Sequence, residues 1–96
     1  MKKEVYLTIL FDYYEKLLSD SDRDVFKDYY FSNLSLGEIS ENNNISRAAV
    51  HKKLKKITEL LCLYEEKLKL YDKEQRILNV LKNEDERRQI KEILND

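Results

Sequence analysis

Apolar side chains recur at every third or fourth position near the start of the chain. Within residues 3–18 they are Tyr6, Ile9, Leu10, Tyr13, Tyr14, Leu17 and Leu18. This spacing places the side chains in one stripe along an α-helix. The pattern therefore predicts a first amphipathic helix over residues 3–18.

A second helix is predicted from Ser21 to about Phe31. Ser21 is the expected N-cap, and Asp22 and Asp24 follow in the first turn, where carboxylates interact favourably with the positive end of the helix dipole. The side chains that this helix is expected to bury are Val25, Phe26, Tyr29 and Tyr30.

A short third helix and a sharp turn are predicted next. Ser35 and Glu38 have the spacing of a capping box, which predicts a helix over residues 36–42 with Ile39 as its main core contact. Three asparagines follow at 42–44. Asparagine tolerates the left-handed backbone conformation that ends many helices, so Asn44, or else Asn43, is expected to form the turn.

The longest helix is predicted to begin just after this turn. Ile45 is expected to fill the corner between the two helices, and Ser46 to cap the second one, with Arg47 as its first residue. No glycine or proline interrupts the chain from here to residue 81, which at 1.5 Å per residue predicts a helix of about 50 Å. Its apolar seam comprises Val50, Leu54, Ile57, Leu61, Tyr64, Leu68 and Tyr71. Asn83 is then expected to begin a last helix, which carries Ile90, Ile93 and Leu94 on one side.

The composition supports an all-α fold. Of the 96 residues, 42% are hydrophobic and 39% charged, with one glycine and no proline, whereas sandwiches and barrels need both residues in their turns. The length suffices for one small domain with an extension. We expect a helical head over residues 1–57, containing a helix-turn-helix at 35–57. Residues 58–96 are then a helical extension that continues the preceding helix and serves in dimerisation.

Positive charge is concentrated in one short segment. The net charge is −1, yet residues 46–57 hold five Lys and Arg and no acid, while residues 1–45 hold five basic against nine acidic residues. A short helix, a tight turn and a longer basic helix together are typical of a helix-turn-helix. This pattern predicts a nucleic-acid interface on the second helix.

Seven side chains are expected to face outward on that helix and to contact nucleic acid: Ser46, Arg47, Ala48, His51, Lys52, Lys55 and Lys56. Arg47 can pair with a guanine edge, Ala48 can contact a thymine methyl, and the lysines can neutralise phosphates. Two alternatives stay open. The basic run is also compatible with a solvated helix face, and the chain's seven tyrosines, expected mainly in the core, could stack on single-stranded bases.

Other chemistry finds little support in the sequence. There is no glycine-rich phosphate loop, no nucleophile with a matched base and no paired carboxylates in an expected pocket, so we expect no enzyme and no cofactor. His51 has no second ligand within helical reach, and we expect no metal site. Cys62 is interpreted as a small buried apolar residue. Without a signal peptide or a long apolar run, a soluble cytoplasmic protein is expected.

Residues 22–56 resemble the region-four helix-turn-helix of sigma factors. The similarity rests on DYYFSNLSLGEIS, residues 28–40, followed by ISRAAVHKKL, residues 45–54. The whole chain, with FDYYEKLL at 11–18 and LYEEKLKLYDKEQRI at 63–77, resembles the small bacterial YlxM-like proteins, which are described as associated with the signal recognition particle. The resemblance implies a sigma-four-like domain with a long C-terminal helix. It also implies a part in protein targeting. The only functional residues that the resemblance assigns to this chain are those of the helix-turn-helix.

These observations leave open the binding partner of the basic helix and the oligomeric state. The basic helix could bind DNA in a regulatory protein, or it could dock on the RNA or the GTPase of the signal recognition particle. The seam from Leu54 to Leu81 could fold back on the first helix or meet a second copy, and a homodimer is the expectation because the head offers little apolar surface to cover it.

Overall fold

The computed structural model describes residues 1–96 and contains only helices. They are α1 (Lys3–Tyr14), the 3₁₀-helix η1 (Glu15–Leu17), α2 (Asp20–Tyr30), α3 (Leu36–Asn43), α4 (Arg47–Leu68), α5 (Leu70–Val80) and α6 (Glu84–Leu94). The prediction of an all-α fold is confirmed. None of these helices combines the length and the apolar character that crossing a membrane requires.

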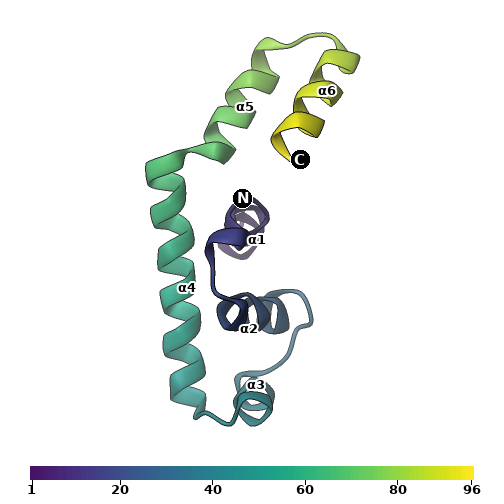
Figure 1. Ribbon diagram of the computed structural model, residues 1–96. Coiled ribbons are helices and arrows are strands. Elements are labelled where there is room, and N and C mark those ends of the chain that lie inside the picture. The colour runs from purple at the N-terminus through teal and green to yellow at the C-terminus, as the bar shows by residue number, and fades with distance from the viewer.

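The helix α4 organises the molecule, which measures 50 × 24 × 24 Å. Figure 1 shows α1, α2 and α3 stacked along one side of α4, each crossing it steeply, with α3 at its N-terminal end. The hairpin of α5 and α6 lies beyond the other end of α4. The turn between α3 and α4 is therefore placed at the opposite end of the molecule from the hairpin.

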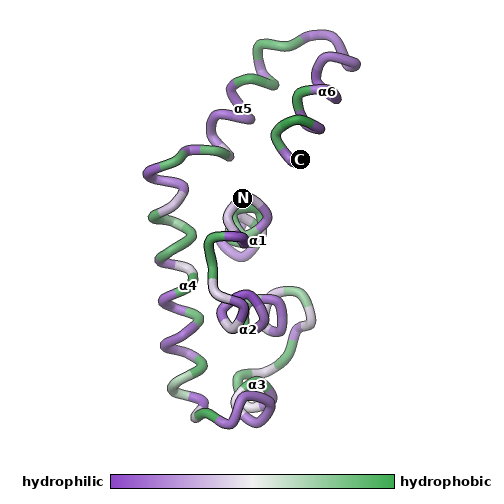
Figure 2. Tube along the Cα trace, viewed as in Figure 1, coloured by the Kyte–Doolittle hydropathy of each residue, from purple (hydrophilic) through white to green (hydrophobic).

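One hydrophobic core joins the four helices α1 to α4. Its members are Leu7, Leu10, Phe11, Tyr14, Leu18, Val25, Phe26, Ile39, Val50, Leu54, Ile57 and Leu61. The rings of Phe11 and Phe26 stack with centroids 4.4 Å apart, and Tyr30 stacks on Phe26 at the same distance. Hydrophobic and hydrophilic residues alternate around the turns of α4 in Figure 2, as expected for a helix with one buried side.

Two helix starts are confirmed by their hydrogen bonds. Ser35 Oγ accepts from the backbone N–H of Glu38 at 3.1 Å, and Glu38 Oε1 accepts from the Ser35 N–H at 3.0 Å, which completes the predicted capping box. The hydrogen bond that the Glu38 carboxylate accepts from the Ser35 backbone N–H is the main cause that lowers the pKa of this carboxyl. Asn83 caps α6 as predicted, with Oδ1 accepting from the N–H of Asp85 at 2.8 Å.

The second helix begins two residues earlier than predicted. Ser19, not Ser21, is the N-cap of α2, because its extended backbone lets Oγ accept from the Asp22 N–H at 3.1 Å. Ser21 lies inside the first turn. The end of the first helix also differs, since the chain tightens into η1 after Tyr14.

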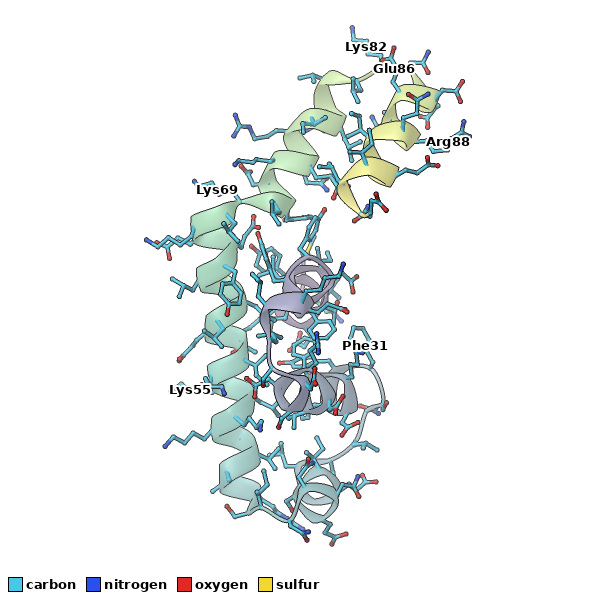
Figure 3. All side chains as sticks on the ribbon, viewed as in Figure 1. Phe31, Lys55, Lys69, Lys82, Glu86 and Arg88 are labelled. Atoms are coloured by element: carbon cyan, nitrogen blue, oxygen red, sulfur yellow. The ribbon has the colours of Figure 1, made fainter.

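The prediction of one unbroken helix from residue 47 to 81 is wrong. The helix continues through the expected boundary at residue 57 but ends at Leu68, because Lys69 adopts the left-handed conformation with φ 56°. Figure 3 shows Lys69 at the corner where the chain turns from α4 into α5. The Glu65 carboxylate lies beneath this corner and accepts from the N–H groups of Tyr71 and Asp72, at 3.2 and 3.1 Å. It thereby caps α5 and stabilises the bend.

Much of the predicted seam is buried within the chain. Leu54, Ile57 and Leu61 are core residues, and Tyr64 lies 5.9 Å from Tyr14 between ring centroids. Leu68, by contrast, is 44% exposed. The division of the chain at residue 57 and the homodimer remain predictions.

Tyr29 and Cys62 were expected to be buried, and both are exposed. Tyr29 is 38% exposed, because Tyr30 takes the place next to Phe26 and leaves Tyr29 at the edge of the aromatic stack. Cys62 is exposed as well, since it stands one position beyond Leu61 and is therefore rotated by about 100° from the buried stripe of α4. The interpretation of Cys62 as a buried apolar residue is wrong.

Candidate nucleic-acid interface

The turn between α3 and α4 has the predicted geometry. Asn44 is left-handed, with φ 55° and ψ 41°, and follows directly after α3. The Ile45 N–H donates to the carbonyl oxygen of Ser40 at 3.1 Å, and Asn43 Nδ2 donates to that of Ile39 at 2.8 Å. These bonds satisfy carbonyl groups that the end of a helix leaves free. The turn is therefore stabilised without a glycine.

Packing anchors the two helices against each other. Ile39 on α3 and Val50 on α4 are fully buried, and Leu54 is 7% exposed, as predicted. Ser40 is also buried, and its hydroxyl is satisfied by donating to the Gly37 carbonyl at 2.8 Å. A serine is accommodated at this position because the helix itself supplies its partner.

Ile45 does not fill the corner as expected. Its side chain is 38% exposed. Ile39 of α3 and Val50 of α4 are instead the fully buried apolar residues on either side of the turn. The expectation that Ile45 is buried in this corner was wrong.

The start of α4 presents the predicted contact residues to solvent. Ser46 caps the helix, with Oγ accepting from the Ala49 N–H at 3.0 Å. All seven predicted contact residues are exposed: Ser46, Arg47, Ala48, His51, Lys52, Lys55 and Lys56. The exposed face of this end of α4 is named here the basic face. Its role in binding stays a prediction.

A buried carboxylate neutralises part of the basic segment. Asp22, at 4% exposure, lies 2.9 Å from Lys56 Nζ and 3.6 Å from Lys53 Nζ. Lys53 Nζ also donates to Ser21 Oγ at 2.6 Å. Lys56 is therefore both exposed and paired, whereas Arg47, Lys52 and Lys55 form no ion pair within the protein. Sequence reasoning missed Asp22 because no local pattern connects it with residues more than 30 positions away.

Arg47 has an unexpected neighbour on α3. A Cβ atom built on Gly37 would lie 2.9 Å from Nη2 of Arg47 and 3.1 Å from its Cζ. The guanidinium therefore lies over the one position of α3 that lacks a side chain. A side chain at position 37 would displace the Arg47 guanidinium from this position.

The carboxylates do not assemble into a metal centre. No cluster of three or more His, Cys, Asp or Glu side chains has an arrangement suited to a metal ion.

Comparison with known proteins agrees with this architecture. The model of one protein family, described as "Putative helix-turn-helix protein, YlxM / p13 like" and designated UPF0122, matches residues 1–96. A UPF0122 protein of Thermoanaerobacter sp. (strain X514) is 44% identical over 77 residues, which cover 80% of this chain and 66% of that relative. A UPF0122 protein of Caldanaerobacter subterraneus subsp. tengcongensis is 45% identical over 74 residues, covering 77% of this chain and 63% of the relative.

A third relative matches nearly the whole chain. A UPF0122 protein of Clostridium acetobutylicum is 38% identical over 94 residues, which cover 98% of this chain and 76% of that protein. The chain thus spans about two thirds to three quarters of the length of these relatives.

Proposed function

We propose that this chain, which belongs to the UPF0122 family of YlxM/p13-like helix-turn-helix proteins, binds duplex DNA through the basic face and acts as a non-enzymatic regulator. One observation carries the proposal. Arg47, His51, Lys52 and Lys55 are exposed together at the N-terminal end of the longer helix of a helix-turn-helix. This is the part of a recognition helix that contacts base edges in the major groove.

The unpaired charges suggest how the helix would meet DNA. Arg47 stands at the first position of α4, where its planar guanidinium can form two hydrogen bonds with a guanine. Lys52 and Lys55 form no ion pair and can contact phosphates. Lys53 and Lys56 are paired with Asp22, which neutralises part of their charge. The resemblance of residues 22–56 to sigma region four also supports DNA as the ligand.

Exchange of both Arg47 and Lys52 for alanine is expected to weaken binding to duplex DNA at least about tenfold. A bidentate contact to guanine contributes about 1–3 kcal/mol, and each lost phosphate contact flattens the plot of log K against log salt by about 0.9. Fluorescence anisotropy with a labelled duplex at several salt concentrations measures both effects.

The matched control is the pair Lys73→Ala and Arg76→Ala on α5. It removes the same two residue types from exposed positions at the far end of the molecule. Equal losses in the two double variants would show that the contribution is general charge, and unchanged binding by the Arg47 and Lys52 variant would refute the assignment of the basic face.

A second candidate function is docking on the RNA or the GTPase of the signal recognition particle. The exposed acids Glu4, Asp12 and Asp24 in the acidic first half of the chain favour it, since they can attract a basic partner to helices other than α4. A pull-down from lysate with and without nuclease separates the two functions. Recovery of the particle's GTPase or RNA without enrichment of promoter fragments would favour docking.

Homodimerisation is also proposed, through apolar residues that the fold leaves exposed. Leu63 and Leu68 on α4 are both 44% exposed, and they belong to its last two turns, whereas the basic face belongs to its N-terminal end. A dimer formed there would leave both basic faces free. Sedimentation of the wild type and a Leu68→Glu variant tests this, and a wild type that stays monomeric at all concentrations contradicts it.

A further inference from the structure

A groove beside the basic face combines tyrosine rings with positive charge. It has a volume of about 360 Å³ and is lined by side chains from the start of α1, the end of α2, the start of α3 and the N-terminal half of α4. The residues that matter for its chemistry are Lys3, Tyr29, Tyr30, Leu36, His51 and Lys55. We name it the tyrosine groove.

The tyrosine rings of the groove pack on aromatic rings of the hydrophobic core. Tyr30 stacks on Phe26, which in turn stacks on Phe11, so that a column of rings rises from the core. Tyr29 stands against Tyr30 with centroids 5.0 Å apart and ring planes at 78°. With 38% of its surface exposed, Tyr29 offers a ring to a ligand at little conformational cost.

The charged side chains that line the groove are all basic, and a carboxylate beyond the lining, that of Glu4 on α1, adds to burial and to Tyr29 in raising the pKa of Tyr30. Three basic side chains line it, from α1 and α4, and no carboxylate does. The opposite flank of α4 differs, because there Asp22 pairs with both Lys53 and Lys56. The two flanks of the basic helix are therefore unequal, and the tyrosine groove is the flank that can accept an anion.

We propose that the tyrosine groove binds one unpaired nucleotide of a nucleic-acid strand, with the base on Tyr29 and the adjoining phosphate held by Lys3 and Lys55. Leu36 and Leu54 add apolar side chains to the lining, which suits the face of a base. Base–aromatic stacking with a nearby positive charge is the usual means of holding single strands, and it tolerates any base. This site lies beside the proposed duplex interface and does not require that duplex DNA be the ligand.

Replacement of Tyr29 by leucine is expected to weaken binding of a short labelled oligothymidylate or oligouridylate by about tenfold, since one stacked base is lost. Affinity for duplex DNA should stay unchanged. Lys3→Ala should weaken the binding of the same oligonucleotides and make their affinity less dependent on salt concentration. Fluorescence anisotropy provides these affinities, and comparing the two oligonucleotides tells whether the ribose hydroxyl contributes.

Two neighbours provide matched controls. Phe31 is an exposed aromatic residue that does not line the groove, and Figure 3 shows it on the side of α2 away from α4. Lys2 is an exposed lysine adjacent to Lys3 that also lies outside the groove lining. Phe31→Leu and Lys2→Ala should therefore bind the oligonucleotides as the wild type does.

The outcomes separate this proposal from the duplex assignment. Wild-type protein that fails to bind either oligonucleotide, or Tyr29→Leu and Lys3→Ala variants that bind like their controls, overturns the tyrosine groove. The effect of Arg47→Ala with Lys52→Ala on duplex DNA is measured independently. Circular dichroism of each variant verifies that helix content is retained.

Discussion

Exchange of Glu65 for alanine is expected to lower the free energy of unfolding by about 2–4 kcal/mol and to release the bend between α4 and α5. The carboxylate of Glu65 accepts from the Tyr14 hydroxyl at 2.5 Å and from two backbone N–H groups of α5. Without it, the buried hydroxyl loses its acceptor and the first turn of α5 loses its cap. Fewer contacts then stabilise the left-handed conformation of Lys69, which is unfavourable for a residue with a side chain.

Two measurements follow the effect of Glu65. Urea unfolding gives the stability, and a spin-label distance between the native Cys62 on α4 and a label introduced by Arg88→Cys on α6 reports the bend. We expect a longer mean distance or a broader distance distribution in the Glu65→Ala protein, because α4 and α5 approach one continuous helix. Glu66→Ala is the control, because Glu66 is exposed on the same helix and forms no hydrogen bond or ion pair. A Glu65 variant that retains the wild-type distance and stability would contradict this account.

This bend explains why the long helix could not be predicted correctly. Between residues 47 and 81 the chain contains neither glycine nor proline, so local sequence favours an uninterrupted helix. The break depends on Tyr14, whose hydroxyl accepts from the Leu70 N–H at 3.0 Å across a separation of 56 residues. A contact between distant parts of the chain has no signature in the local periodicity.

Features determined by neighbouring residues were predictable. The capping box of Ser35 and Glu38, the left-handed Asn44 and the cap at Ser46 all involve side chains and backbone groups within four positions of each other. Each was read from the sequence and is confirmed. Where two neighbouring residues offered the same chemistry, as Ser19 and Ser21 do at α2, the sequence alone did not distinguish them.

The candidate site shows the same division. Charge along the chain predicted a basic segment, and helical spacing predicted which of its side chains face outward. The ion pairs of Asp22 with Lys53 and Lys56 were not foreseen, nor was the position of Arg47 over Gly37. Lys3 and Tyr29 likewise became candidates only when the fold placed α1 and α2 beside α4. The chemistry of a surface made by several helices depends on their packing.

Stability is expected to fall by about 2–3 kcal/mol between pH 10 and pH 12 because of Tyr14. Burial raises the pKa of Tyr14 to about 12, and the hydrogen bond to Glu65 raises it further than the bond from Leu70 lowers it. The unfolded chain therefore loses this proton near pH 10, while the folded protein retains it to about pH 12. Since each unit of difference corresponds to about 1.4 kcal/mol, the stabilisation is complete below pH 10 and is lost as pH rises through the folded pKa.

A Tyr14→Phe variant isolates this contribution. Phenylalanine fills the same space in the core but cannot ionise, and it also removes the bonds to Glu65 and Leu70. It should therefore be less stable than the wild type at pH 8, and the difference should shrink toward pH 12. Burial also raises the pKa values of Tyr6 and Tyr30, so both proteins should retain some dependence on pH. Urea unfolding at several pH values provides the comparison, and a difference between wild type and variant that is constant with pH would show that Tyr14 is not the group that titrates.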